Sequence, residues 1–410
     1  MQDKPSGPLA GVKVLDLTTI FMGPSTTQML GDFGADVTKV ESPQGDVVRG
    51  IGPNGERGMG PVFLHVNRNK RSIVLDLKTE RGMEAVRKLA RDTDVLVYNV
   101  RPAAMARLGL GYEELRKLNP RLIYVGTFGY SQRGRYAPDA AFDDAIQAAV
   151  ALPQAALMAG SDVPRYAPIT IVDRAVGLYA MGVVCAALYA RERTGEGQAV
   201  DVPMFETMTQ VVMADHLYGH TFVPEKAGFG YPRVVNPHRR PYKTKDGYIG
   251  VMVYTDDQWR KYLELVGRKD EFDTDPRYRS LASRTRHIGE LYAIVSEELK
   301  ERTTQEWRDA LLPLDIPAFA MNTFETLMDD PHLAEIGFFQ QVEHPTEGRI
   351  RTMACPSEWS GTPPSIRRHA PQLGEHSLEI LEELGYSEAN ILGFLADGVS
   401  RAAPGKSSNG

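Results

Sequence analysis

One side chain of this sequence is placed for covalent chemistry. It is Asp173, in the segment 168–177 that leads into a long apolar run. A carboxylate at the start of a helix is stabilised by backbone N–H groups and by the positive helix end. We therefore expect Asp173 to be isolated, ionised at neutral pH and able to act as a nucleophile. From its position alone, the alternative is an N-cap without a catalytic role.

The spacing of other residues disfavours several chemistries. The turn near Gly31 and Gly34 lacks the three-glycine dinucleotide motif, and Arg133 replaces the last glycine of a serine-hydrolase elbow. No metal-ligand spacing occurs, and Cys185 and Cys355 form no CxxC pair. We therefore expect no metal and no permanently bound cofactor. The net charge of −6 argues against a nucleic-acid partner.

The elements that must position Asp173 alternate between short β-branched runs and helical stretches. Strands are predicted at residues 12–17, 37–41, 72–77, 94–99 and 122–126. This alternation predicts a parallel sheet in an α/β fold. Because ligands bind at the carboxyl ends of such strands, we expect binding residues at 18–24, 78 and 99–101.

Changes of pattern along the chain predict its domains. We expect the N-terminal part of a large α/β domain at residues 1–222, a Gly-, Pro- and aromatic-rich linker at 223–241, a small α+β domain at 242–325, a return to the large domain at 326–399 and a disordered tail at 400–410. The small domain begins with a hairpin that turns at Asp246-Gly247. The large domain is therefore interrupted by the small one.

We expect a cytoplasmic protein without membrane attachment. The first strand begins by Val12, which leaves no room for a charged and then apolar secretory signal. The longest apolar run, residues 175–190, is shorter than the roughly 18 residues that cross a bilayer and is predicted to be a core helix. Two cysteines without a pairing pattern also fit a reducing compartment.

Eight short motifs follow one another along the chain. They lie at residues 11–16, 34–41, 69–78, 119–124, 194–198, 244–247, 330–333 and 373–376, with Asp173 and Gly177 between the fourth and the fifth. Together they extend over nearly all of residues 8–396. In this order they resemble the family III CoA-transferases, the group that contains formyl-CoA transferase and the carnitine CoA-transferase.

The resemblance implies that Asp173 attacks an acyl-CoA thioester and forms a mixed anhydride, then an aspartyl-CoA thioester. A small carboxylic acid then takes the CoA, so that acyl-CoA and the acid are the partners of the enzyme. The positions that match the family's CoA-binding residues are Thr19, Ile20, Met22, Leu75, Lys78, Asn99, Val100 and Arg107. Met204 matches a residue near the active aspartate, with a core methionine as the alternative.

Some features of the sequence concern the ligands more closely. Members that act on formate or oxalate carry a glycine-rich gate in the small domain, whereas the nearest pair here is Gly228 and Gly230 in the linker, so we expect another acyl group. Recognition of a diacid by arginine is a hypothesis, with candidates at Arg133, Arg135 and Arg239. The basic cluster Arg68, Lys70 and Arg71 could meet nucleotide phosphates or form a structural turn.

Two other functions are alternatives. The α-methylacyl-CoA racemases use a histidine from a His-Asp pair that corresponds to Phe142-Asp143 here, and phenylalanine cannot transfer a proton. No histidine lies between His65 and His216, which also favours the transferase. A non-catalytic acyl-CoA-binding protein would bind CoA without forming a covalent intermediate.

The resemblance also implies an architecture. The large domain would be a doubly wound, Rossmann-like parallel sheet formed by both chain ends, joined to a smaller α+β domain. Two copies of the chain would form an interlocked homodimer.

Overall fold

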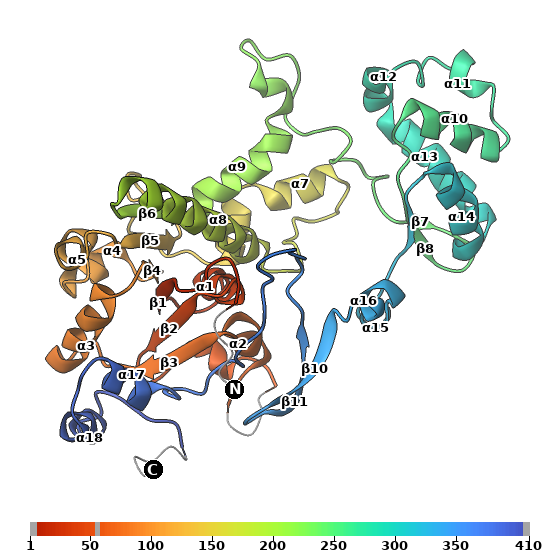
Figure 1. The fold of residues 1–410 in the computed structure, drawn as a ribbon. Helices are drawn as coiled ribbons and strands as arrows, with labels where there is room; N and C mark the ends of the chain where they lie inside the picture. Colours follow the sequence, from red (N-terminus) through yellow and green to blue (C-terminus); the bar gives the residue numbers. More distant parts are fainter. Residues whose placement is uncertain (1–5, 54–57, 405–410) are drawn as a thin grey trace. The chain divides into compact units, whose positions relative to one another are not determined.

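The β-branched runs of the N-terminal half form a six-stranded parallel sheet with the order β3-β2-β1-β4-β5-β6 (Figure 1). Its strands are β1 (Lys13–Leu17), β2 (Asp36–Glu41), β3 (Lys70–Val74), β4 (Val95–Tyr98), β5 (Ile123–Phe128) and β6 (Gln198–Pro203). The chain order reverses between β1 and β4, where ligands bind in open α/β sheets. The predicted parallel sheet is confirmed.

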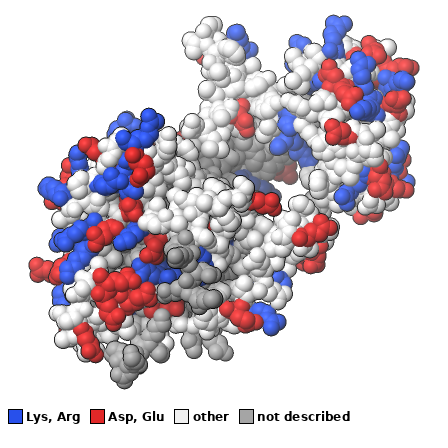
Figure 2. Space-filling view, in the orientation of Figure 1, with Lys and Arg blue, Asp and Glu red and all other residues white. Residues whose placement is uncertain are grey.

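The structure is a computed structural model that describes residues 6–53 and 58–404. Unit 1 comprises Met1–Ile146, Ile169–Met208 and Pro331–Gly410, and unit 2 comprises Gln147–Pro168 and Thr209–Asp330. Both ends of the chain therefore contribute to the unit that contains the large sheet. On the face shown in Figure 2, acidic and basic side chains lie among one another on both units.

Helices cover both faces of the large sheet. The elements of unit 1 outside the sheet are α1 (Met22–Asp32), a 3-10 turn (Val47–Gly50), α2 (Pro61–Val66), α3 (Glu80–Arg91), α4 (Pro102–Arg107), α5 (Tyr112–Leu118), α6 (Asp143–Ala149), α8 (Ile171–Thr194), α9 (Met204–His216), α16 (Pro331–Glu335), the antiparallel pair β10 (Phe339–His344) and β11 (Gly348–Met353), α17 (Ser377–Glu383) and α18 (Glu388–Ala396). Helices α6 and α9 continue past the boundary of unit 1.

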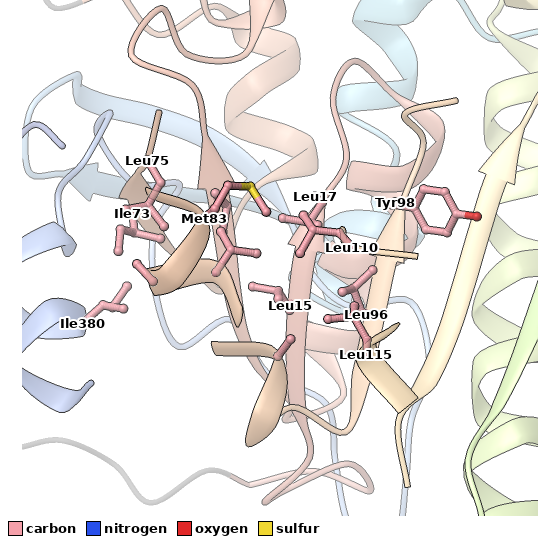
Figure 3. Close-up of a cluster of buried hydrophobic side chains, with 14 of the residues drawn as sticks. Leu15, Leu17, Ile73, Leu75, Met83, Leu96, Tyr98, Leu110, Leu115 and Ile380 are labelled. Atoms are coloured by element: carbon pink, nitrogen blue, oxygen red, sulfur yellow. The ribbon is translucent and has the colours of Figure 1, made fainter. Parts of the chain in front are cut away.

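The main core lies on one face of this sheet. Leu15 and Leu96 from the strands pack with Met83 of α3 and Ile380 of α17 (Figure 3). Because side chains alternate along a strand, Asp16 points to the opposite face, where its carboxylate accepts a hydrogen bond from Thr27 of α1. Helix α8 packs against α1, so these two helices form the second layer.

Unit 2 contains a three-stranded antiparallel sheet, β7-β8-β9. Its elements are α7 (Leu152–Met158), a 3-10 turn (Tyr218–Thr221), β7 (Tyr242–Lys243), β8 (Tyr248–Val251), α10 (Asp256–Leu265), α11 (Glu271–Thr274), α12 (Leu281–Arg286), α13 (Ile288–Glu298), a 3-10 turn (Leu299–Glu301), α14 (Thr304–Leu311), a 3-10 turn (Leu312–Leu314), β9 (Ala318–Ala320) and α15 (Phe324–Met328). Trp259, Tyr262 and Trp307 fill its core. The smaller antiparallel sheet of the predicted α+β part is confirmed.

The units divide the chain differently from the expected domains. Residues 147–168 lie in unit 2, and unit 2 resumes at Thr209, before the expected linker at 223–241. The segment expected as a linker is tied to α9, because the N–H groups of Gly230 and Tyr231 donate to His216 at 2.9 and 3.4 Å. Aromatic stacking of Tyr231 on Tyr218 also joins this segment to the 3-10 turn that follows α9.

Helix α8 is longer than the apolar run that predicted it. It has 24 residues, and among the described residues it is the one helix that is long and apolar enough to cross a membrane by length and composition. The expectation of a run too short for this is therefore wrong. In unit 1, α8 packs against α1, β5 and β6, as a core helix does.

The predicted disorder of residues 400–410 is wrong for the beginning of this segment. Ser400 and Ala403 are buried, the Ser400 N–H donates to the Phe394 carbonyl at 3.0 Å, and Arg401 donates to the Pro43 carbonyl at 2.9 Å. These contacts attach the segment to unit 1. Residues 405–410 lie outside the described part of the chain.

Two buried ion pairs lie beneath the carboxyl end of β1. Lys70 Nζ donates to Asp16 at 2.9 Å and Lys39 Nζ donates to Asp46 at 3.0 Å, with all four side chains excluded from solvent. Burial opposes ionisation of Asp16, but Lys70 and Lys39 hold the pKa of its carboxyl well below the usual range. Burial lowers the pKa of Lys70 to about 8, although Asp16 raises it. One pair thus joins β1 to β3 across the sheet, and the other joins β2 to the segment that follows it. Each buried charge of a pair is stabilised by the opposite charge of its partner.

Replacing Lys70 tests this connection. Lys70→Met leaves the Asp16 carboxylate buried without its cation, so we expect the free energy of unfolding at pH 7 to fall by about 3–5 kcal/mol, measured by chemical denaturation. The matched control is Lys13→Met on the exposed start of β1, with an expected change within about 0.5 kcal/mol. Equal stability of the two variants would contradict this role of Lys70.

Candidate active site

A pocket of about 240 Å³ lies at the carboxyl ends of β1, β4 and β5. Its lining comes from residues 19–22 after β1, residues 99, 101 and 102 after β4, and residues 127–130 and 132 at the end of β5. Residues 137 and 139–142, Asp173 of α8 and Met204 of α9 complete it. All of these residues belong to unit 1. The pocket therefore occupies the position at which the strand order reverses.

The turn after β1 is held by the buried ions beneath it. Lys39 Nζ donates to the Thr18 carbonyl at 2.7 Å, and the Ile20 N–H donates to the Asp46 carboxylate at 3.2 Å. Ile20 has a φ of 74°, which is unfavourable for a β-branched residue and persists where surrounding contacts hold the backbone. The ion pairs thus fix the wall of the pocket that follows β1.

Asn99 joins the two loops on either side of the strand reversal. Its Oδ1 accepts from the Thr19 N–H at 3.1 Å, and its Nδ2 donates to the Thr19 carbonyl at 2.8 Å. An amide side chain supplies both a donor and an acceptor, so it replaces the backbone partners that a strand would have provided. Asn99 therefore positions the loop after β1 relative to the end of β4.

Asp173 lies in the first turn of α8 and lines the pocket while half-buried. The N-cap of α8 is Thr170, so the alternative that Asp173 is itself the N-cap is wrong. The Asp173 N–H donates to Oδ2 of Asp143 at 3.0 Å. This hydrogen bond fixes the backbone of Asp173 and places a second carboxyl group beside it.

The environment of Asp173 changes its ionisation. Burial, followed by the negative charge of Asp143, raises the pKa of Asp173 to about 7, although Arg174 acts in the opposite direction. The expectation of an isolated carboxylate is wrong, because Asp143 lies beside Asp173. The raised pKa places the titration of Asp173 near neutral pH, whereas an ordinary aspartate is ionised well below it. A carboxyl group with a raised pKa in a pocket is typical of a functional site.

The residues predicted to bind CoA fall into two sets. Thr19, Ile20, Met22 and Asn99 line the pocket together with Asp173. The other four do not line it: Leu75 is fully buried in the core of unit 1, and Lys78, Val100 and Arg107 are exposed. The role of all eight in CoA binding stays a prediction.

The basic cluster after α2 has structural partners. Lys70 pairs with Asp16, Arg68 donates to Asp32, and Arg71 pairs with Asp36 and Glu383. The alternative of a structural role is therefore the one that these contacts support. Met204 is buried, as a core methionine would be, and it also lines the pocket together with Asp173.

Several lining residues were not singled out from the sequence. They include Tyr130, Gln132 and Asp139 from the loop after β5. The predicted strand at 122–126 could have indicated this loop through the strand-end rule. Arg101 lines the pocket, whereas Arg133 and Arg135 do not, and recognition of a diacid by arginine stays a prediction. Among the described residues, no group of three or more His, Cys, Asp or Glu side chains could hold a metal ion.

This chain is similar to known proteins over nearly its whole length. The sequence model described as CoA-transferase family III matches residues 9–377. The chain is 32% identical to human succinyl-CoA:glutarate CoA-transferase, over 96% of this chain and 90% of the relative. It is 32% identical to formyl-CoA:oxalate CoA-transferase of Escherichia coli, over 94% of this chain and 98% of the relative.

A solved structure gives the same result for the fold. A CAIB/BAIF family protein from Brucella suis matches with a TM-score of 0.75 and 30% sequence identity, over 92% of this chain and all of that chain. The resemblance inferred from the ordered motifs is thus confirmed. The chain is a CoA-transferase enzyme and belongs to CoA-transferase family III.

Proposed function

We propose that this enzyme transfers CoA from an acyl-CoA thioester to a free carboxylic acid through covalent intermediates on Asp173. The observation that carries the proposal is the position of Asp173, which lines the pocket at the strand reversal with its backbone fixed by Asp143. This chemistry requires a carboxylate. A carboxylate can form an anhydride with the acyl group and then a thioester with CoA, and each of these bonds can be broken in the next step. Enzymes of this family use CoA thioesters as substrates.

In the first half-reaction, a carboxylate oxygen of Asp173 attacks the thioester carbonyl. The C–S bond breaks, a mixed anhydride forms, and CoA leaves as a thiolate. The thiolate then attacks the Asp173 carbonyl carbon. The anhydride C–O bond breaks, the donor acid leaves as a carboxylate, and Asp173 carries CoA as a thioester.

The second half-reaction reverses these steps with another acid. The acceptor carboxylate attacks the Asp173 thioester, which gives a new mixed anhydride and CoA thiolate. The thiolate attacks the acyl carbonyl of the acceptor, forming the product thioester and releasing Asp173 as a carboxylate. No net proton is taken up or released, so a nucleophilic carboxylate can perform the exchange without a partner that transfers protons.

This chemistry agrees better with the pocket than racemisation does. Phe142, at the position of the racemase histidine, lines the pocket and is 64% exposed. A phenyl ring cannot accept or donate the proton that a racemase moves. A non-catalytic acyl-CoA-binding protein is not favoured either, because the relatives with printed activities are transferases.

Substitution of Asp173 tests the covalent route. Asp173→Asn retains the shape of the side chain but removes the nucleophile, so we expect turnover to fall by about 10³-fold or more. Hydroxylamine added with acyl-CoA should inactivate the wild type by capturing its activated carboxyl group. The control Asp144→Asn changes an exposed neighbour of Asp143 and should retain both turnover and inactivation. Normal turnover of Asp173→Asn would refute the assignment.

The pKa of Asp173 predicts a pH dependence. The nucleophile is the ionised form, so kcat/KM should decline about tenfold per unit as the pH falls below about 7. Asp143→Asn removes the neighbouring negative charge and keeps an oxygen for the Asp173 N–H. We expect it to lower the pKa of Asp173 and to shift the acid limb to lower pH.

The same control variant serves this measurement. Asp144→Asn should leave the acid limb in place, because its side chain is exposed to solvent. If the acid limb of Asp143→Asn coincided with that of the wild type, Asp143 would not be what raises the pKa of Asp173.

We also propose that the enzyme acts as a homodimer in the cytoplasm. Large exposed side chains on α8 support an assembly, with Leu178, Tyr179 and Tyr189 each more than half exposed. Sedimentation of the purified protein is expected to give a particle of two chains, and a fully active monomer would contradict this. Cell fractionation tests the location.

A further inference from the structure

Unit 2 contains a cavity of about 370 Å³ that is separate from the pocket of Asp173. It is lined by Arg233, Met252, Tyr254, Thr255, Gln258 and Pro317. These residues come from the segment before β7, the segment between β8 and α10, the first turn of α10 and the position just before β9. The Met252 N–H donates to the Pro317 carbonyl at 3.2 Å and so holds two walls together.

Arg233 is a cation whose hydrogen-bonding capacity is largely unused. Its Nη2 donates to the Met252 sulfur at 3.7 Å, and its Nε is buried without a partner. A thioether is a weak acceptor, whereas a guanidinium has five N–H donors. Its charge lies 5.7 Å from the Tyr254 ring centroid, and among the described residues no carboxylate forms an ion pair with it.

Two of the other polar side chains of the cavity, Gln258 and Thr255, are already paired. Gln258 Oε1 accepts from the N–H groups of Tyr254 and Thr255 at 2.9 and 3.1 Å, and its Nε2 donates to the Asp315 carbonyl at 2.6 Å. Thr255 Oγ accepts from the Gln258 N–H at 3.1 Å in the capping box of α10. Arg233 is thus the cation of the lining, and its N–H donors suit an anion.

A second arginine adds positive charge to this region. Burial raises the pKa of Tyr292, and the charges of Arg233 and Arg239 both act on the same phenol to lower it. The segment that carries both arginines has a defined backbone, since the N–H groups of Val234 and Val235 donate to the Tyr231 carbonyl. Both arginines thus add positive charge around Tyr292 of α13, which does not line the cavity, and Arg233 is the cation of the cavity itself.

We propose that this cavity of unit 2 binds a small organic acid, whose carboxylate pairs with Arg233 and whose carbon chain contacts Met252, Tyr254 and Pro317. A planar guanidinium matches the two oxygens of a carboxylate. The thioether, the aromatic ring and the proline ring provide apolar surface that a carbon chain can cover and an inorganic anion cannot. The proposal does not rest on the covalent chemistry of Asp173, because binding here requires no CoA.

Methyl NMR of the full-length protein tests the proposal. With 13C-methyl methionine, the signal of Met252, identified through Met252→Leu, reports on this cavity among the 15 methionines. Butyrate is expected to shift this signal in a saturable manner. Butyramide, which lacks the charge, and inorganic phosphate, which lacks the carbon chain, are expected not to.

The arginine variants show whether Arg233 is the partner. Arg233→Gln should weaken butyrate binding at least about tenfold, and Arg233→Lys, which keeps the charge without the planar fork, should weaken it less. The control Arg286→Gln, at an exposed position of α12, should bind as the wild type does. Unchanged signals of the other methionines verify folding, and Arg233→Lys serves as the test if Arg233→Gln does not fold.

Three results would overturn the proposal. The first is a Met252 signal that does not respond to butyrate. The second is equal affinity of Arg233→Gln and the wild type, or of Arg233→Lys and the wild type if Arg233→Gln does not fold. The third is an equal response to phosphate or butyramide, which would indicate a general anion site or an apolar cavity.

Discussion

The buried pair of Lys39 and Asp46 is the interaction on which the pocket depends. Lys39 holds the Thr18 carbonyl while Asp46 accepts from the Ile20 N–H, so one ion pair fixes both sides of the turn that follows β1. Asp16 and Lys70 form the second pair and fix β1 to β3. Because neither charge of a pair is stable in the interior alone, the sheet and the turn form together.

These two ion pairs support a pocket whose residues are far apart in the sequence. The turn after β1 is joined by Asn99 to the end of β4, and Asp173 enters the same pocket from the first turn of α8. Asp143 accepts a hydrogen bond from the Asp173 backbone, and burial together with the charge of Asp143 raises the pKa of Asp173. A carboxyl group with a pKa of about 7 is more basic than an exposed aspartate, and this suits the role of nucleophile that we propose for Asp173.

The periodicity of the strands in the sequence predicted the parallel sheet and part of the pocket. The β-branched runs that became β1 and β4 were evident, and with the strand-end rule they indicated the loops that contribute Thr19 and Asn99 to the pocket. The charged start of β3 was missed, because Lys70 is buried only through its pairing with Asp16, 54 residues earlier. The order of short motifs predicted the family, although no single motif would have been sufficient.

The features that the sequence did not predict depend on contacts between residues that are far apart in the chain. The pairing of Asp143 with Asp173 depends on how the loop after β5 folds over the sheet, and no periodic pattern encodes this. The assignment of residues 147–168 to unit 2 and the burial of Ser400 likewise depend on distant partners. Local sequence therefore indicated where the ligand-binding edge of the sheet lies, but not the electrostatic environment of its carboxyl group.

The most direct measurement is peptide mass mapping after the enzyme has been mixed with acyl-CoA in the absence of an acceptor acid. The account predicts that CoA is attached to the peptide that contains Asp173 and that the Asp173→Asn variant carries none. An enzyme that turns over while its CoA is attached elsewhere, or is never attached, would contradict it.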